Sequence, residues 1–189
     1  RPSKKGQTEE TESPSEETPE EMIESAYARH LESLSDGLLE QVMAMPPAFF
    51  EHLVTRLLLA MGYGKGLTTA GSVTGGSGDE GIDGIINEDK LGLDVIYIQA
   101  KRWTSPVGRP EIQRFVGALH GKHAQKGVFI TTSTFSQEAR DYVKTLNLKV
   151  VLVDGKTLAR LMVDYNVGVS AKATYVLKSI DRDFFEGPE

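Results

Sequence analysis

The stretch from Gly81 to Trp103, GIDGIINEDKLGLDVIYIQAKRW, constrains the fold of this chain more than any other. Two short apolar runs are joined by the turn-rich sequence NEDKLG, which predicts an antiparallel hairpin. The first run carries one carboxylate, Asp83, and the second ends with Gln99 and Lys101. Because side chains alternate between the faces of a strand, Gln99 and Lys101 share a face, and pairing can bring Asp83 beside Gln99. We therefore expect a carboxylate, an amide and an ammonium group at one place.

This combination favours a divalent-metal site. Mg²⁺ prefers oxygen ligands, which Asp83, Gln99 and the main-chain carbonyl of Ala100 can supply. A metal there would polarise a phosphoryl group and acidify a bound water, while Lys101 would orient that water or stabilise the transition state. Glu51 is a candidate for holding a metal-bound water from a helix. The pattern predicts phosphodiester hydrolysis with Mg²⁺, for which Mn²⁺ should substitute, although Glu51 and Lys101 taken singly also read as solvated surface residues.

Apolar periodicity predicts alternating helices and strands over the rest of the chain. Helices are expected at 48–61, 110–123, 133–146 and 155–165, and strands at 67–73, 126–132, 148–153 and, as a further edge strand, 175–180. Residues 22–45 are expected to form a helical lead-in that Ser35, Asp36 and Gly37 break in two. Strands joined by helical crossovers predict an α/β fold, with a mixed β-sheet flanked by helices on both faces.

Charge is distributed unevenly along the chain, whose net charge is −6. Residues 1–21 contain seven Glu and three basic residues and are expected to be a disordered acidic linker. From Lys90 to Lys126, seven Lys and Arg face two acids, a local balance of +5 that favours phosphate binding. A solvated helix face explains the charges equally well, and core packing is the alternative for Trp103. The expected DNA contacts are Arg102, Trp103, Arg109, Arg114 and Lys122.

A glycine-rich loop precedes the hairpin. Residues 76–81, GSGDEG, have the spacing of the dinucleotide-binding motif G-x-G-x-x-G. That motif requires a helix after its glycines, and here a strand-like run follows, so dinucleotide binding is disfavoured. We expect the loop to bring Asp79 near Asp83 as an accessory group.

The remaining features concern the setting of the protein. There is no cysteine, no apolar run of membrane-spanning length and no apolar region typical of a signal peptide near the start. A cytoplasmic protein without a membrane partner is the expectation. The chain does not begin with Met, which suggests a piece of a longer protein. Residues 46–180 are expected to form the main domain and residues 181–189 a C-terminal tail.

Five motifs between Pro47 and Val169 together resemble the catalytic domain of Mrr-like type IV restriction endonucleases, members of the PD-(D/E)xK nuclease superfamily. They are FFEHLVTRLLLAMGYG, GDEGIDGII, DVIYIQAKRW, GVFITTSTFSQEA and VVLVDGKTLARLM. The resemblance implies a restriction-endonuclease-like fold and Mg²⁺-dependent cleavage of double-stranded DNA at modified (methylated) sites. By position, Asp83 takes the aspartate role, Lys101 is the lysine and Glu51 is the helix glutamate. Gln99 stands where the superfamily usually has Asp or Glu, which leaves one negative charge fewer and makes Glu51 or Asp79 more important.

The resemblance also implies features beyond the hairpin. Full-length members carry an N-terminal winged-helix-like domain that recognises DNA, and the acidic residues 1–21 look like the linker to it. Cleavage of both strands needs two active sites, so a homo-oligomer is expected. Two alternatives stay open at this point: a repair or junction-resolving nuclease of the same fold, and a non-catalytic DNA-binding module.

Overall fold

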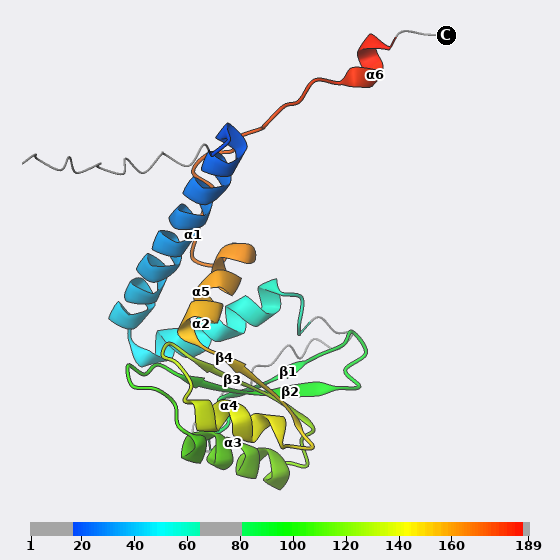
Figure 1. Cartoon of the computed structure of the whole chain (residues 1–189). Helices are drawn as coiled ribbons and strands as arrows, with labels where there is room; N and C mark the ends of the chain where they lie inside the picture. Colours follow the sequence, from blue (N-terminus) through cyan, green and yellow to red (C-terminus); the bar gives the residue numbers. More distant parts are fainter. Residues whose placement is uncertain (1–16, 65–80, 187–189) are drawn as a thin grey trace, which may run out of the picture.

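A computed structural model describes residues 17–64 and 81–186 (Figure 1). The elements in these ranges are α1 (Pro19–Ala44), α2 (Pro47–Ala60), β1 (Gly84–Asn87), β2 (Val95–Lys101), α3 (Arg109–Gly121), β3 (Lys126–Thr131), α4 (Gln137–Lys144), β4 (Lys149–Val153), α5 (Gly155–Asp164) and α6 (Arg182–Phe185). None of the helices within these ranges is long and apolar enough to cross a membrane.

The four strands form one mixed sheet in the order β1-β2-β3-β4. Strand β1 pairs antiparallel with β2, with Gly84 opposite Ile98, which confirms the predicted hairpin. Strands β2, β3 and β4 are parallel, and Lys101 at the end of β2 lies opposite Thr131. The parallel pairs are connected by α3 and by α4, as the crossover rule for such strands requires.

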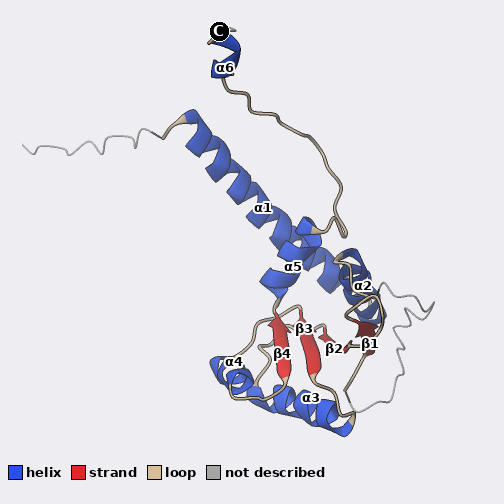
Figure 2. Cartoon of the chain, turned by 90° about the vertical axis from the view of Figure 1, so that its right-hand side faces the viewer, coloured by secondary structure: helices blue, strands red, loops and turns tan. Residues whose placement is uncertain are grey.

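Helices cover both faces of the sheet, as predicted (Figure 2). Helices α1, α2 and α5 share one apolar cluster with Ile96, Ile98 and Ala100 of β2, and α3 and α4 share the other with Tyr97. These four residues show the period-2 alternation of a strand buried on both sides. Phe50 and Leu57 of α2 are each only 1% exposed, and burial of a side chain of this size contributes about 2 kcal/mol.

Local signals explain where several helices begin. Pro47 and Pro110 occupy the first turns of α2 and α3, where the missing N–H costs nothing. The Ser136 side chain caps α4 by accepting from the N–H of Ala139, and the Asp154 side chain caps α5 by accepting from the N–H of Thr157.

Helix α1 differs from its prediction in two respects. It runs unbroken through Ser35, Asp36 and Gly37, because Leu38 and Val42 are buried with α5 and outweigh the roughly 1 kcal/mol cost of one helical glycine. It also begins at Pro19, inside the expected acidic linker, because Thr18 and Glu21 form a reciprocal capping box.

Two predicted strands have different outcomes. Residues 175–180 form no strand, and their backbone leads away from the sheet (Figure 1), so that prediction was wrong. The edge of the sheet is formed by β4 instead. The strand expected at 67–73 lies outside the described residues.

Substitution of Gly155 tests the close packing of α5 against the sheet. A Cβ at this position would lie 2.2 Å from the carbonyl oxygen of Thr132, so the backbone must move. We expect Gly155→Ala to destabilise the fold by about 1–3 kcal/mol in urea unfolding. Gly117→Ala in α3 is the control: its Cβ meets nothing within 4 Å, and the change should stabilise by about 0.5–1 kcal/mol. Equal unfolding midpoints for the two variants would contradict this packing.

Asp154 should make stability depend on acid pH. Burial raises the pKa of its carboxyl, but hydrogen bonds from Thr157 and Arg140 outweigh burial and hold the pKa below its ordinary value. A lowered folded pKa means that the stabilisation is present above the unfolded value of about 3.9 and is lost as pH falls through the folded value. Asp154→Asn removes the ion pair, so it should cost about 1 kcal/mol near pH 6 and progressively less below pH ~4. Urea midpoints from pH 6 to pH 3 measure this, and a constant difference would contradict it.

Candidate functional site

Asp83 is fixed at the beginning of β1 by two hydrogen bonds to β2. Its N–H donates to the carbonyl of Ile98 at 2.8 Å, and its Oδ2 accepts from the N–H of Ala100 at 2.7 Å. Its second carboxylate oxygen, Oδ1, makes no hydrogen bond with the described residues. The carboxylate is therefore held in one orientation with one oxygen left for a ligand.

Asp83 and Glu51 line one cavity of about 340 Å³. Glu51 comes from α2, and Asp83 comes from the sheet opposite it. Ile82 and Ile85 both pack in the α3 cluster, so strict alternation breaks between them and Asp83 is left facing α2. The other lining residues are His52, Val54, Thr55, Gly84, Ile98 and Ala100. Two carboxylates from different elements thus line one space.

Gln99 lies beside this space but does not line it. Strand alternation puts it on the face of Tyr97, and its side chain is buried, with only 6% of the residue exposed. The amide makes no hydrogen bond with the described residues. A Cβ on Gly81 would lie 3.0 Å from the Gln99 Nε2, and Gly81 has a φ of +96°, so a glycine is needed there. The buried amide is close to the chain that leads into Asp83.

The main chain of Lys101 is anchored at the end of β2. Its carbonyl accepts from Thr131 Oγ1 at 2.8 Å and from the N–H of Thr132 at 3.3 Å. Thr131 is fully buried, and its hydroxyl group holds the end of β2 through this hydrogen bond. The half-buried side chain of Lys101 makes no ion pair with the described residues, and it does not line the cavity. The sequence placed four residues in one region: Glu51, Asp83, Gln99 and Lys101. Of these four, only Asp83 and Glu51 line the cavity.

The donor set fits a hard cation. Two carboxylates and the Ala100 carbonyl are all oxygen donors, and Mg²⁺ typically takes one or two carboxylates and completes its shell with water and phosphate oxygens. No group of three or more His, Cys, Asp or Glu residues suited to a metal occurs within the described residues. Asp79 lies outside the described residues.

Arg102 has a structural contact. Its Nη1 donates at 2.6 Å to the carbonyl of Met43, in the last turn of α1, and its buried Nε finds no partner among the described residues. Helix α1 has no basic residue of its own in its last turn, so Arg102 supplies the cation that a helix C-terminus favours. Trp103 is half-buried against the α3 cluster, which agrees with the packing alternative.

The other expected DNA contacts lie along α3. Arg109 stacks over the Tyr142 ring at 4.9 Å, and Arg114 pairs with Glu111 at 2.6 Å while its side chain stays 76% exposed. Helix α3 leads from the end of β2 to the start of β3, so Arg109 lies toward the Lys101 end of the sheet. Lys122 caps the opposite end of the helix, roughly 20 Å away.

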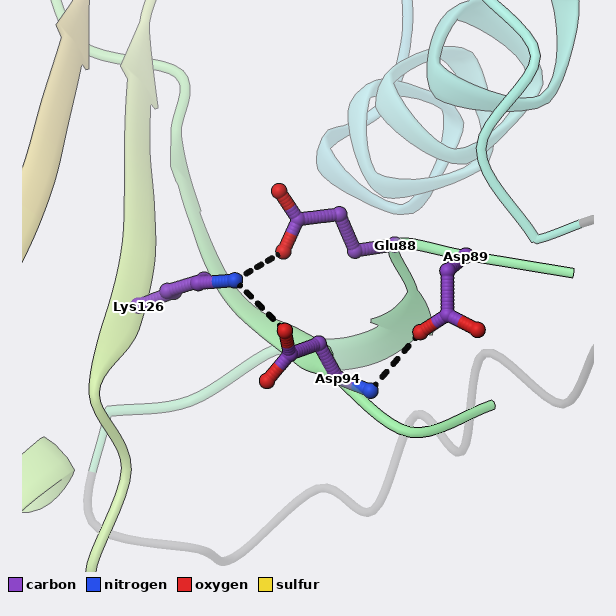
Figure 3. A network of polar contacts seen from close by, with 4 residues as sticks. All are labelled: Glu88, Asp89, Asp94 and Lys126. Carbon is purple, nitrogen blue, oxygen red and sulfur yellow. Dashed lines mark hydrogen bonds and ion pairs between the residues drawn. The ribbon is translucent and has the colours of Figure 1, made fainter. Parts of the chain in front are cut away.

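The charge of Lys126, counted above in the basic stretch, is neutralised by two ion pairs (Figure 3). Its Nζ donates to Glu88 at 2.5 Å and to Asp94 at 2.9 Å, and these bonds raise the pKa of Lys126. Asp89 Oδ2 accepts from the N–H of Asp94 at 2.8 Å, which lowers the pKa of Asp89. The cluster ties the hairpin turn to the start of β3. The positive balance counted along the sequence therefore overstates the free charge.

Sequence analysis missed His52 and Thr55 as cavity residues. A signal was present for Thr55, since residues four apart on a helix share a face and Thr55 lies at that spacing from Glu51. His52 directly follows Glu51, and no spacing rule would have selected it.

Residues 42–162 match the family model Mrr_cat, described as restriction endonuclease. The match covers more than half of the chain, which therefore belongs to this family of restriction endonucleases. It is 44% identical over 169 residues to the type IV methyl-directed restriction enzyme EcoKMrr of Escherichia coli (strain K12). That alignment covers 89% of this chain and 55% of the relative, so the chain spans about half the length of the curated protein it matches.

A solved structure shows the same fold. The DNA modification-dependent restriction endonuclease AspBHI aligns with a TM-score of 0.54 at 21% identity, over 74% of this chain and 36% of that one. The structure of MspJI restriction endonuclease in complex with a 27-mer oligonucleotide aligns with a TM-score of 0.45 at 29% identity, over 76% and 33% of the two chains. The restriction-endonuclease-like α/β fold predicted from the motifs is confirmed by the AspBHI alignment together with the mixed sheet.

Proposed function

We propose that this chain is the cutting module of a metal-dependent endonuclease that hydrolyses phosphodiester bonds of double-stranded DNA and restricts modified, methylated DNA. The observation that carries the proposal is the pairing of Asp83 and Glu51 across one cavity, with Asp83 fixed by the Ala100 N–H. Membership of the restriction endonuclease family supports it, and so does the name of the 44% identical relative.

Each candidate catalytic residue is assigned a separate role. When bound, Mg²⁺ or Mn²⁺ would supply two effects, polarisation of the phosphoryl group and a more acidic water. Asp83 Oδ1 and the Ala100 carbonyl are the groups that would hold it, and Glu51 faces them from α2, where it can orient water. Lys101 offers an ammonium that stabilises negative charge developing on the phosphate oxygens. Gln99 offers an amide at the same strand end.

Recognition of the modified site is assigned to parts beyond this cavity. The chain corresponds to 55% of its relative, and we propose that the complete protein adds an N-terminal winged-helix-like domain that selects the DNA. Because each chain carries one cavity of this kind among its described residues, cutting both strands calls for at least two chains acting together.

The carboxylate and the lysine are tested by cleavage of supercoiled plasmid in Mg²⁺ or Mn²⁺. Asp83→Asn removes the fixed metal-binding charge, and Lys101→Ala removes the ammonium, so each should slow nicking by at least about 100-fold. Glu51→Gln should have a smaller effect, because it changes a group that acts through water. Asp164→Asn and Lys156→Ala, both at exposed positions on α5, are the charge-matched controls.

Wild-type rates for the Asp83 and Lys101 variants, with contaminating nuclease excluded by the same purification, would refute the assignment. A panel of methylated, unmethylated and branched duplexes separates restriction from a repair or junction-resolving activity. If the module alone cleaves nothing, the comparison is repeated after fusion to the recognition domain of the relative, and inactivity there would also refute it.

The α3 cations are tested by the salt dependence of DNA binding. A phosphate contact releases counterions, so Arg109→Ala, Arg114→Ala and Lys122→Ala should each reduce the slope of log K against log salt by about one. Lys156→Ala is the control, since Lys156 is 88% exposed on α5 on the opposite face of the sheet. An unchanged slope for an α3 variant would assign that residue to the solvated-face alternative.

A further inference from the structure

Among the described residues, the buried polar side chains are those of Gln99 and Thr131, and both lie where the parallel strands end. Gln99 stands two residues before the end of β2, and Thr131 is the last residue of β3. Burying a hydroxyl group is costly unless the group forms hydrogen bonds, and a valine in its place would avoid that cost. The partners of Thr131 therefore indicate what its hydroxyl group does.

The Thr131 hydroxyl is the first of three successive hydroxyl groups that donate to the chain at and after the end of β2. The three bonds are Thr131 Oγ1 to the carbonyl of Lys101 at 2.8 Å, Thr132 Oγ1 to that of Trp103 at 2.8 Å, and Ser133 Oγ to that of Thr104 at 3.1 Å. The pairing of β2 with β3 ends at Lys101 and Thr131, and the side chains continue the attachment beyond it. We call residues 131–133 the hydroxyl clamp.

The hydroxyl clamp is itself fixed in position. Thr131 Oγ1 accepts from the N–H of Ser133 at 3.2 Å, so one hydroxyl group links both strand ends. The carbonyl of Ser133 accepts at 2.8 Å from the N–H of Gly155, the first residue of α5. The three hydroxyl groups are thus presented by a segment that is tied to α5.

Lys101 depends on its main chain for its position. No hydrogen bond or ion pair with the described residues holds its ammonium group, and a lysine side chain is long and flexible. Three donors converge instead on the Lys101 carbonyl: Thr131 Oγ1 at 2.8 Å, the N–H of Thr132 at 3.3 Å and the N–H of Trp103 at 3.1 Å. The direction in which the side chain leaves the strand is therefore set at the main chain.

We propose that Thr131 is a positioning residue for Lys101, with Thr132 and Ser133 in supporting roles. The proposal rests on the cutting function proposed above, in which the Lys101 ammonium stabilises negative charge on the phosphate. A catalytic group displaced by about 1 Å can lose on the order of 100-fold in rate. The hydroxyl clamp therefore acts on the chemical step and leaves DNA binding almost unchanged.

Single-turnover cleavage of duplex DNA by saturating protein separates the chemical step from binding. Thr131→Val removes the hydroxyl group and keeps the branched shape, so it should slow cleavage by about 10- to 100-fold, while the Kd for the same duplex in EDTA changes by less than about twofold. Thr131→Ser restores the hydroxyl group and should recover most of the rate. Thr145→Val is the matched control, because it removes a hydroxyl-to-carbonyl bond of 2.7 Å at the end of α4, and it should cut at the wild-type rate.

A double-mutant cycle with Lys101→Ala shows whether Thr131 acts through the lysine. If it does, Thr131→Val has no ammonium left to displace, and the double variant should cut within about twofold of the Lys101→Ala rate. A purely structural role would slow the double variant by a further factor of about 10 or more. That outcome overturns the proposal, as do a wild-type rate for Thr131→Val, a Kd that weakens as much as the rate falls, and failure of the Thr131→Ser rescue.

Hydrogen exchange tests the hydroxyl clamp without any cleavage. Thr131→Val should speed amide exchange in a peptide covering residues 100–105 by at least about 10-fold, and Thr145→Val should leave it unchanged. Unchanged exchange in Thr131→Val overturns the proposal whether or not the chain cuts DNA. A wild-type chain that cuts in no form overturns the proposed function instead, which differs from the case in which wild type and Thr131→Val cut equally.

Discussion

The hydrogen bond from the Ala100 N–H to the Asp83 carboxylate is the contact on which the site depends. It lies where β1 begins and β2 ends, so it fixes both the end of the hairpin and the direction of the carboxylate. The same end of β2 is also held by the neighbouring strand β3. The Lys101 carbonyl accepts hydrogen bonds from Thr131, the last residue of β3, and from Thr132 directly after it. With α2 packed against β2, the strand end has little freedom, and a preorganised site loses little entropy when it binds a charged ligand.

The two faces of the sheet divide the polar groups in a way that the sequence did not reveal. Asp83 faces α2, the helix that carries Glu51. Strand alternation instead puts Gln99 and Lys101 on the face that α3 covers. Groups from both faces can reach one phosphodiester only around the end of the sheet, where β2 terminates. Arg109 begins α3 near that end, and Lys122 lies about 20 Å away along the helix. DNA at the strand end therefore meets Arg109 first, and it reaches Lys122 only if the duplex also runs along α3.

Local patterns predicted most of the fold, and long-range contacts account for the failures. The hairpin and the helices expected at 48–61 and 110–123 depend on neighbouring residues, and all were predicted. The continuity of α1 depends on packing against α5, more than a hundred residues away. Lys126 was counted as a free cation because its partners Glu88 and Asp94 approach it only once β2 and β3 are paired. His52 required the same tertiary information, because no spacing rule identifies it as a cavity residue.

Arg102 connects the C-terminal end of α1 to the strand that ends at the site. It directly follows Lys101, and its guanidinium donates to the carbonyl of Met43 at the end of α1. Because that bond is charge-assisted and half-buried, it fixes the angle at which α1 leaves the sheet. The end of β2 that carries Gln99 and Lys101 is thus tied to α1 as well as to β3, because the next residue donates to Met43 and the Lys101 carbonyl accepts from Thr131.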